Sequence, residues 1–281
     1  MSFALAAASD SVENEADIPK AVSKVMVGVS AGMVLGAPVA GLIVNSSTLR
    51  MGLLFFAAVN LISLVATIFF VPNFAMSEKT SYGQQLRILR EKKLWLALIG
   101  VLFLNGAIFG VYSYISAYLE EVVNLPAQMI SAVLFIYGLT NIVGNTVAGK
   151  GLSSNPNHFI RIQPAVIGSV YILLLLVAEK MMIPALIIIL VWGISAGAVA
   201  NVIQYWVTSA APAAPEFANG LYLTAANLGI SVATPFCGMF INGMGTHAAP
   251  VGGILLVICS AVCIFLKIRV MDVKGKSSYM K

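Results

Sequence analysis

Uncharged polar side chains recur at helical spacing inside four long apolar segments of this chain. In each segment they lie three, four or seven residues apart, so they share one face of a helix. Amides, hydroxyls and a phenol can form hydrogen bonds with a polar solute or with each other. These residues are Asn105, Tyr112, Asn141, Asn145, Asn201, Gln204, Thr224 and Asn227.

Two interpretations of these polar faces stand side by side. Polar residues at membrane depth often mark a pathway or a binding site. Asn, Thr and Gly also join membrane helices to one another, at about 0.6 kcal/mol per hydrogen-bonded pair. The presence of four such faces favours a binding role for the set, whereas Asn60, which lacks such company in its segment, is expected to be structural.

No acidic residue lies deep inside an apolar segment. Glu120, Glu121 and Glu179 fall at the ends of apolar segments, and the other acids lie outside these segments. The sequence has no HExxH pattern, no clustered aspartates and no glycine-rich phosphate loop. Together these features predict no metal site, no cofactor and no enzyme activity.

The elements that must position the polar faces are membrane-spanning helices. The chain has 59% hydrophobic and only 10% charged residues, with a mean hydropathy of +0.94, which excludes an ordinary soluble domain. Eight segments reach the roughly 20 residues that a helix needs to cross a bilayer. We therefore predict an all-α polytopic membrane protein with eight transmembrane helices, at 21–44, 51–72, 94–119, 127–149, 159–178, 184–208, 218–241 and 250–268.

The distribution of basic residues gives an orientation. When the eight segments are threaded through a bilayer, every lysine and arginine except Arg50 and Lys180 falls on one side. Basic residues collect on the cytoplasmic side of a membrane protein. Both termini are therefore predicted to be cytoplasmic, in the cell membrane, and the basic residues imply no nucleic-acid partner.

The lengths of the connections group the predicted spans. Most connections are short, but residues 73–93 form a polar, basic linker between the second and third spans. We expect five parts, with the six spans after the linker forming one half of a transporter. They are 1–20, a helix stub and cytoplasmic loop; 21–72, two spans left of an N-terminal half; 73–93, the cytoplasmic linker; 94–268, the C-terminal six-helix half; and 269–281, a cytoplasmic tail.

The first span carries a glycine and proline motif. Gly28, Gly32 and Gly36 repeat every four residues on one face, which permits close helix approach, and Pro38 introduces a bend before Gly41. This motif resembles the one in the fifth helix of major facilitator superfamily antiporters of the drug:proton and sugar-efflux branch.

Later segments extend the resemblance. Residues 138–150 resemble the eighth helix and the following loop of that superfamily, and residues 201–207 and 225–230 resemble its tenth and eleventh helices. The resemblance covers nearly the whole chain as family helices five to twelve plus a stub of the fourth, and thus implies an N-terminally truncated member, bacterial in origin.

The resemblance also implies a function. It places the polar faces around a central cavity that works by alternating access, and predicts efflux of a small organic solute such as a sugar or drug through the lipid bilayer. Proton coupling would then depend on a carrier in the four family helices that precede this chain. The alternative is a truncated, non-transporting helix bundle, a relic of such a permease.

Overall fold

The computed structural model describes residues 32, 36, 39–44, 46–70 and 86–278. The chain divides into two compact units, which are treated separately below. One unit comprises residues 1–79 with 131–138, and the other comprises residues 80–130 with 139–281.

Long apolar helices make up almost all of the described chain. Seven of them, within the described residues, are long and apolar enough to cross a membrane. The predicted class, an all-α polytopic membrane protein, is confirmed. The first predicted span, 21–44, lies largely outside the described residues. The seven helices run from Leu49–Phe69, Lys92–Tyr112, Ala127–Ser154, Pro156–Val177, Met182–Thr208, Phe217–Met244 and Thr246–Arg269.

Within residues 1–79, the described part of the first unit is a short helical segment followed by one long helix; residues 131–138 of the same unit lie within α7 (Ala127–Ser154). Residues 39–44 are helical, and α3 spans Leu49–Phe70. The Val44 side chain occupies the space beside Gly52, where a methyl group would overlap it. The two helical stretches therefore touch next to the turn that joins them.

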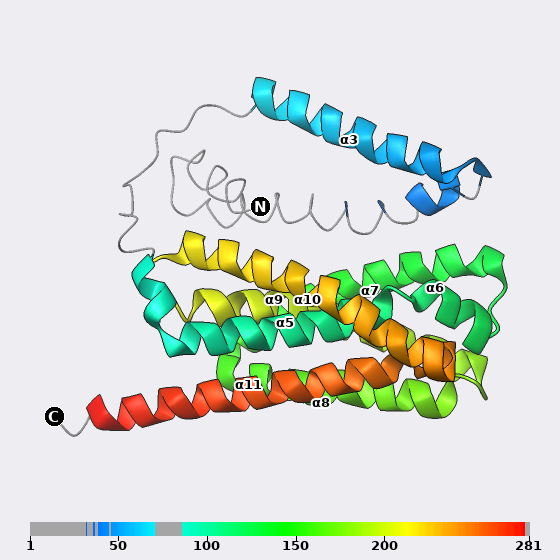
Figure 1. Ribbon diagram of the computed structural model, residues 1–281. Coiled ribbons are helices and arrows are strands. Elements are labelled where there is room, and N and C mark those ends of the chain that lie inside the picture. The colour runs from blue at the N-terminus through cyan, green and yellow to red at the C-terminus, as the bar shows by residue number, and fades with distance from the viewer. Residues whose placement is uncertain (1–31, 33–35, 37–38, 45, 71–85, 279–281) are drawn as a thin grey trace. The chain divides into compact units, whose positions relative to one another are not determined.

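The second unit is an up-and-down bundle whose elements follow one another with short connections (Figure 1). The order is η2 (Ile88–Arg90), α5 (Lys92–Tyr112), α6 (Ile115–Ala117), η3 (Tyr118–Val122), α7 (Ala127–Ser154), α8 (Pro156–Val177), α9 (Met182–Thr208), α10 (Pro215–Met244), η4 (Thr246–Ala248) and α11 (Ala249–Ser278).

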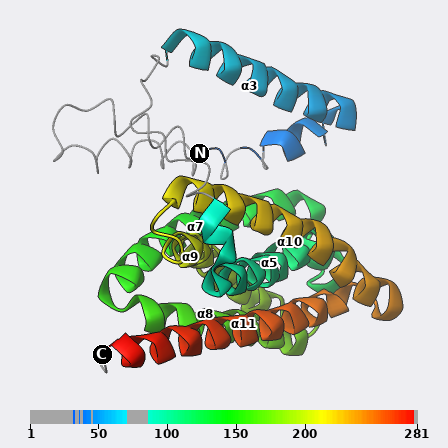
Figure 2. The same ribbon diagram turned by 60° about the vertical axis from the view of Figure 1, so that its left-hand side comes forward.

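The bundle has two ends, named here after the short helices that mark them. The η2 end holds the start of α5, the α7–α8 turn and the α9–α10 turn, and the η4 end holds η3, the α8–α9 turn and η4. Consecutive long helices run in alternating directions, so α5 and α10 are parallel to each other whereas α11 runs opposite to α5 (Figure 2).

Helix α5 is the core of this unit. Its most apolar window is 67% buried, the highest value among the seven described spans, and it packs against α9, α10 and α11. The contact with α10 is made by main chain and small residues: a methyl group at Gly229 would overlap the Leu102 carbonyl, and one at Gly110 would crowd Ala233. Residues without bulky side chains let two membrane helices approach to this degree.

The opposite side of α5 is joined to α11. The Ser260 hydroxyl donates to the Gly100 carbonyl across 3.0 Å, and both residues are buried. Farther along, Gly253 of α11 lies against Val111 and the ring of Tyr171, where it leaves no room for a side chain. Helix α5 is therefore held between α10 and α11 along its length.

Helix α5 ends earlier than the sequence predicts. The predicted span continues to residue 119, but the α-helix stops at Tyr112 and the chain turns at Ser113 and Tyr114. The hydroxyl of Ser113 caps the break by donating to the Phe109 carbonyl at 2.7 Å. A short helix and one π-helical turn, Tyr118–Val122, follow, so the apolar residues beyond the break pack as a separate piece.

Candidate functional site

The polar faces of α7 and α9 meet at two glycines. A methyl group at Gly144 of α7 would overlap the Ile194 carbonyl of α9, and one at Gly197 of α9 would overlap the Asn141 carbonyl of α7. The Asn141 side chain lies beside Gly197 at the same contact. Because each helix presents a glycine to the backbone of the other, their polar side chains are brought within hydrogen-bonding range.

An amide pair follows directly after this contact. The side-chain nitrogen of Asn201 donates to Oδ1 of Asn145 across 2.7 Å. It also donates to the Gly197 carbonyl of its own helix at 3.1 Å. Both asparagines are half-buried. The structure thus brings together two predicted site residues from different helices.

A second amide pair joins α9 to α10. The side-chain nitrogen of Gln204 donates to Oδ1 of Asn219 across 3.0 Å. Asn219 is 7% exposed and was not among the residues expected from the sequence. The sequence pattern does not single it out, because Asn219 lies in the first turns of α10, one residue before Gly220 and off the polar face that carries Thr224 and Asn227.

Asn105 lies apart from these pairs. Its side chain is buried, and its amide nitrogen donates to the Ala226 carbonyl of α10 across 2.9 Å. This hydrogen bond is made at the close contact of α5 with α10. The geometry is that of a residue joining two helices, and a role in solute binding stays a prediction.

Tyr112 belongs to an aromatic group near the η4 end. Its half-buried ring lies edge-on to Trp192 of α9, with 6.1 Å between the centroids. Trp192 is fully buried and meets Tyr171 of α8 in the same manner at 5.5 Å. The Tyr171 hydroxyl in turn donates to the Ala107 carbonyl at 2.7 Å. Three helices therefore fix the position of the Tyr112 ring.

Thr224 and Asn227 form hydrogen bonds within their own helix. The Thr224 hydroxyl donates to the Gly220 carbonyl at 3.0 Å, and the Asn227 amide donates to the Leu223 carbonyl at 2.8 Å. Both side chains are exposed on α10. Among the described residues they form no hydrogen bond with either amide pair, so their place in a cavity stays a prediction.

The motif of the first predicted span is only partly described. Gly28 and Pro38 lie outside the described residues, whereas Gly32, Gly36 and Gly41 are helical. The close helix approach that their spacing predicts is not tested.

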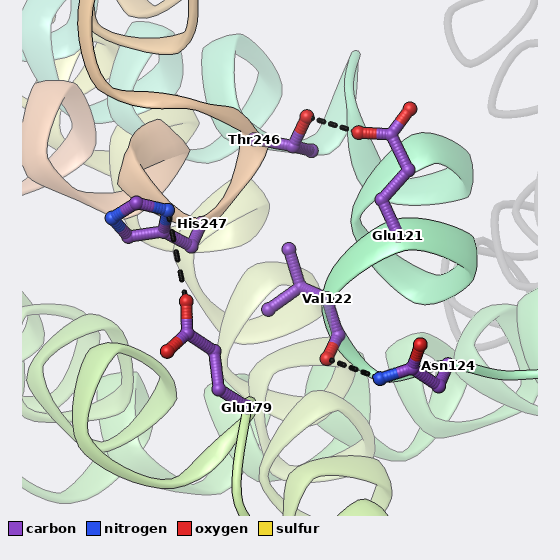
Figure 3. A pocket seen from close by; sticks show the side chains of 6 residues that line it. All are labelled: Glu121, Val122, Asn124, Glu179, Thr246 and His247. Carbon is purple, nitrogen blue, oxygen red and sulfur yellow. Dashed lines mark hydrogen bonds and ion pairs between the residues drawn. The ribbon is translucent and has the colours of Figure 1, made fainter.

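A polar hollow of about 250 Å³ opens at the η4 end (Figure 3). Glu179 from the α8–α9 turn faces His247 of η4, with 3.6 Å from Oε1 to Nδ1, and the Thr246 hydroxyl donates to Glu121 of η3. Asn124, on the same rim, donates to the Val122 carbonyl. These contacts link three separate connections of the bundle. Within the described part of the chain, no group of three or more His, Cys, Asp or Glu could hold a metal ion.

Apolar spans joined by buried amides and glycines define a polytopic membrane protein whose helices carry polar faces toward one another. Residues 1–234 match the family model described as Major Facilitator Superfamily. The chain belongs to this superfamily, which confirms the family predicted from its sequence.

Known relatives are membrane transporters by name. The inner membrane transport protein YdhP of Escherichia coli (strain K12) is 26% identical over 258 residues, covering 89% of this chain and 64% of the relative. The uncharacterized MFS-type transporter YtbD of Bacillus subtilis (strain 168) is 25% identical, covering 84% and 61%. A probable sugar efflux transporter of Pasteurella multocida (strain Pm70) is 24% identical, covering 88% and 61%. The chain spans less than two thirds of the length of these relatives.

Solved structures support the fold. The major facilitator transporter FucP, in an outward conformation, aligns with a TM-score of 0.57 at 14% identity, covering 78% of this chain and 54% of FucP. A bacterial homologue of the human lysosomal transporter Spinster, inward-facing and unoccupied, aligns with a TM-score of 0.64 at 14% identity, covering 90% and 71%.

Proposed function

We propose that this protein takes part in moving a small organic solute, such as a sugar or drug, out of the cell by alternating access. The superfamily match over residues 1–234 carries the proposal. The name of one relative, a probable sugar efflux transporter, supports efflux of a sugar-like solute. Proton coupling is part of the proposal, as the family resemblance implies.

The amide pairs support a cavity for an uncharged polar group. The hydrogen bonds leave Asn145 its side-chain nitrogen as a donor, Asn201 its side-chain oxygen as an acceptor, and Gln204 its side-chain oxygen and a second N–H. Half-burial leaves these groups within reach of a solute that enters beside α7 and α9. Tyr112 adds an aromatic surface supported by Trp192. Asn105, Asn141, Thr224 and Asn227 remain further candidates.

The topology follows from the same proposal. The η2 end is cytoplasmic, because Lys92, Lys93 and Lys150 lie there, and the η4 end with its acidic hollow faces outward. The protein lies in the inner or plasma membrane of a bacterium with both termini inside. In this proposal, residues 94–268 are the six-helix half of the transporter.

Flux through proteoliposomes tests the function. The full chain is reconstituted, and uptake of a panel of radiolabelled sugars and cationic dyes is followed with and without a pH gradient. Flux that depends on the pH gradient supports proton-coupled transport. Flux that does not depend on the gradient contradicts proton coupling. A chain that inserts and moves none of the panel supports the alternative, a helix bundle without transport.

Two variants test the cavity. We expect Asn141→Leu and Asn227→Leu to raise the KM for the solute, because each removes an amide from a polar face. Asn60→Leu is the matched control, since the Asn60 amide donates to Phe56 of its own helix, as Asn227 does to Leu223. An unchanged KM in both test variants would remove Asn141 and Asn227 from the cavity.

A further inference from the structure

A buried lysine stands at the η2 end of α11. The Lys267 side chain is 1% exposed, and its ammonium donates to the Trp206 carbonyl of α9 across 2.7 Å. The same ammonium lies 3.4 Å from the centroid of the Trp206 ring. An ammonium is costly to bury in apolar surroundings unless it is matched by specific partners, and this one is matched by a carbonyl and an aromatic face.

No carboxylate that the structure describes compensates the charge. Among the described residues no acidic group lies within ion-pair distance of Lys267. The neighbouring charge on α5 is another lysine, Lys93. The hydrogen bond and the ring of Trp206 are therefore what stabilises the ammonium in its place.

The accepting carbonyl belongs to the last turn of α9, which ends at Thr208. Carbonyls of a last turn lack partners within the helix and form the negative end of its dipole. Besides Lys267, the Ser209 hydroxyl approaches the Trp206 carbonyl at 3.3 Å. The lysine of one helix thus caps the end of another.

The same stretch of α9 makes two more polar contacts. Asn201 donates to Asn145 of α7, and Gln204 donates to Asn219 of α10. Within six residues, α9 is therefore joined to α7, α10 and α11 in three different directions. The contact with Lys267 is the only charged one of the three. A helix held from three sides has a fixed rotation about its axis.

We infer that Lys267 is a positioning residue that fixes the rotation of α9 and so presents the amides of Asn201 and Gln204 in the arrangement seen here. The inference rests on the proposed function in one respect, namely that these two amides serve solute binding. The position of α9 itself can be tested without a solute.

Thiol labelling reports the rotation of α9. Cys237, Cys259 and Cys263 are replaced by alanine, and single thiols are introduced by Val202→Cys, Val207→Cys or Tyr205→Cys in the full chain. Val202 and Val207 are 1% and 0% exposed, whereas Tyr205 is 39% exposed. The rate of reaction with a water-soluble maleimide is measured in detergent for each thiol.

In this background Lys267→Met should speed labelling at positions 202 and 207 about tenfold, because a charge-assisted hydrogen bond is lost. Position 205 should change little. Lys267→Arg should restore protection, since a guanidinium also donates and stacks on an indole. Lys150→Met, at an exposed lysine of α7, is the matched control and should leave all rates unchanged.

Unchanged protection of positions 202 and 207 in Lys267→Met would overturn the inference, as would equal acceleration at all three positions or failure of Lys267→Arg to restore protection. If Lys267→Met does not yield monodisperse protein, the labelling rates are measured in Lys267→Gln instead. It retains a donor but loses the charge, so faster labelling supports the inference and parental rates overturn it. Labelling as expected, combined with unaltered flux in Asn201→Leu, would instead contradict only the solute-binding role proposed for Asn201.

Discussion

The side-chain nitrogen of Asn201 lies 2.7 Å from Oδ1 of Asn145, and this hydrogen bond joins α9 to α7 just beyond the contact of Gly197 with Asn141. Gly144 and Gly197 let the two helices approach closely, and the amides of Asn145 and Asn201 form a hydrogen bond across this contact. The polar faces are therefore held in register by the same contact that brings them together.

The amide pair should be energetically coupled. Asn145→Leu and Asn201→Leu should each lower the free energy of unfolding by about 1 kcal/mol, because each leaves the other amide without its partner. The double variant should lose less than the two single losses together, by about 0.6 kcal/mol. Denaturant titration in mixed micelles measures all four proteins. Thr146→Val, whose hydroxyl contacts only its own helix among the described residues, serves as the control. Strictly additive losses would contradict the pairing.

Gly197→Ala should be among the most damaging small substitutions in α9. The added methyl group would overlap the Asn141 carbonyl, so the helices must separate, at a cost of about 1–3 kcal/mol. Gly149→Ala is the control, because a methyl group there meets no described atom within 4 Å. The midpoint of thermal unfolding in detergent compares the two. A parental midpoint for Gly197→Ala would mean that α7 and α9 do not approach so closely.

The ion pair at the η4 end should contribute little to stability. Glu179 and His247 are 60% and 49% exposed, and solvent-exposed pairs are worth about 0–1 kcal/mol. Glu179→Gln should therefore shift the free energy of unfolding by less than about 0.5 kcal/mol, with the remaining effect removed by high salt. Titrations at low and high ionic strength measure this. A large loss that persists in salt would show that the pair is shielded.

The proposed topology predicts opposite labelling of the two ends. In the chain without natural cysteines, a thiol introduced by His247→Cys should react with an impermeant maleimide in intact cells. A thiol introduced by Ser153→Cys, at the end of α7, should react only after the cells are opened. Both positions are exposed, so access depends on the side of the membrane. The reverse pattern would invert the orientation that the basic residues predict.

The long helices were predictable because lipid imposes a simple demand: about 20 apolar residues with all backbone groups paired internally. The end of α5 was not, since the sequence stays apolar across the turn at Ser113. The α-helix stops at Tyr112 although the residues beyond it are also apolar, so hydropathy does not register this boundary.

The candidate site was predictable as a set of faces but not as a set of partners. The spacing placed Asn145 and Asn201 on polar faces of their helices. Whether the two side chains meet depends on how α7 and α9 are rotated and on their relative depth in the bundle, which the sequence does not reveal. Asn219 was missed because it lies one residue off its stripe. Lys267 was counted among the basic residues at the edges of spans, and the sequence gives no sign that its ammonium turns inward onto Trp206.

The contact of α5 with α10 consists largely of main-chain atoms and small residues such as Gly106 and Ala233. This contact does not depend on the side chains on the remaining surfaces of either helix. Side chains on those surfaces can therefore be exchanged in evolution while the contact between the two helices is kept.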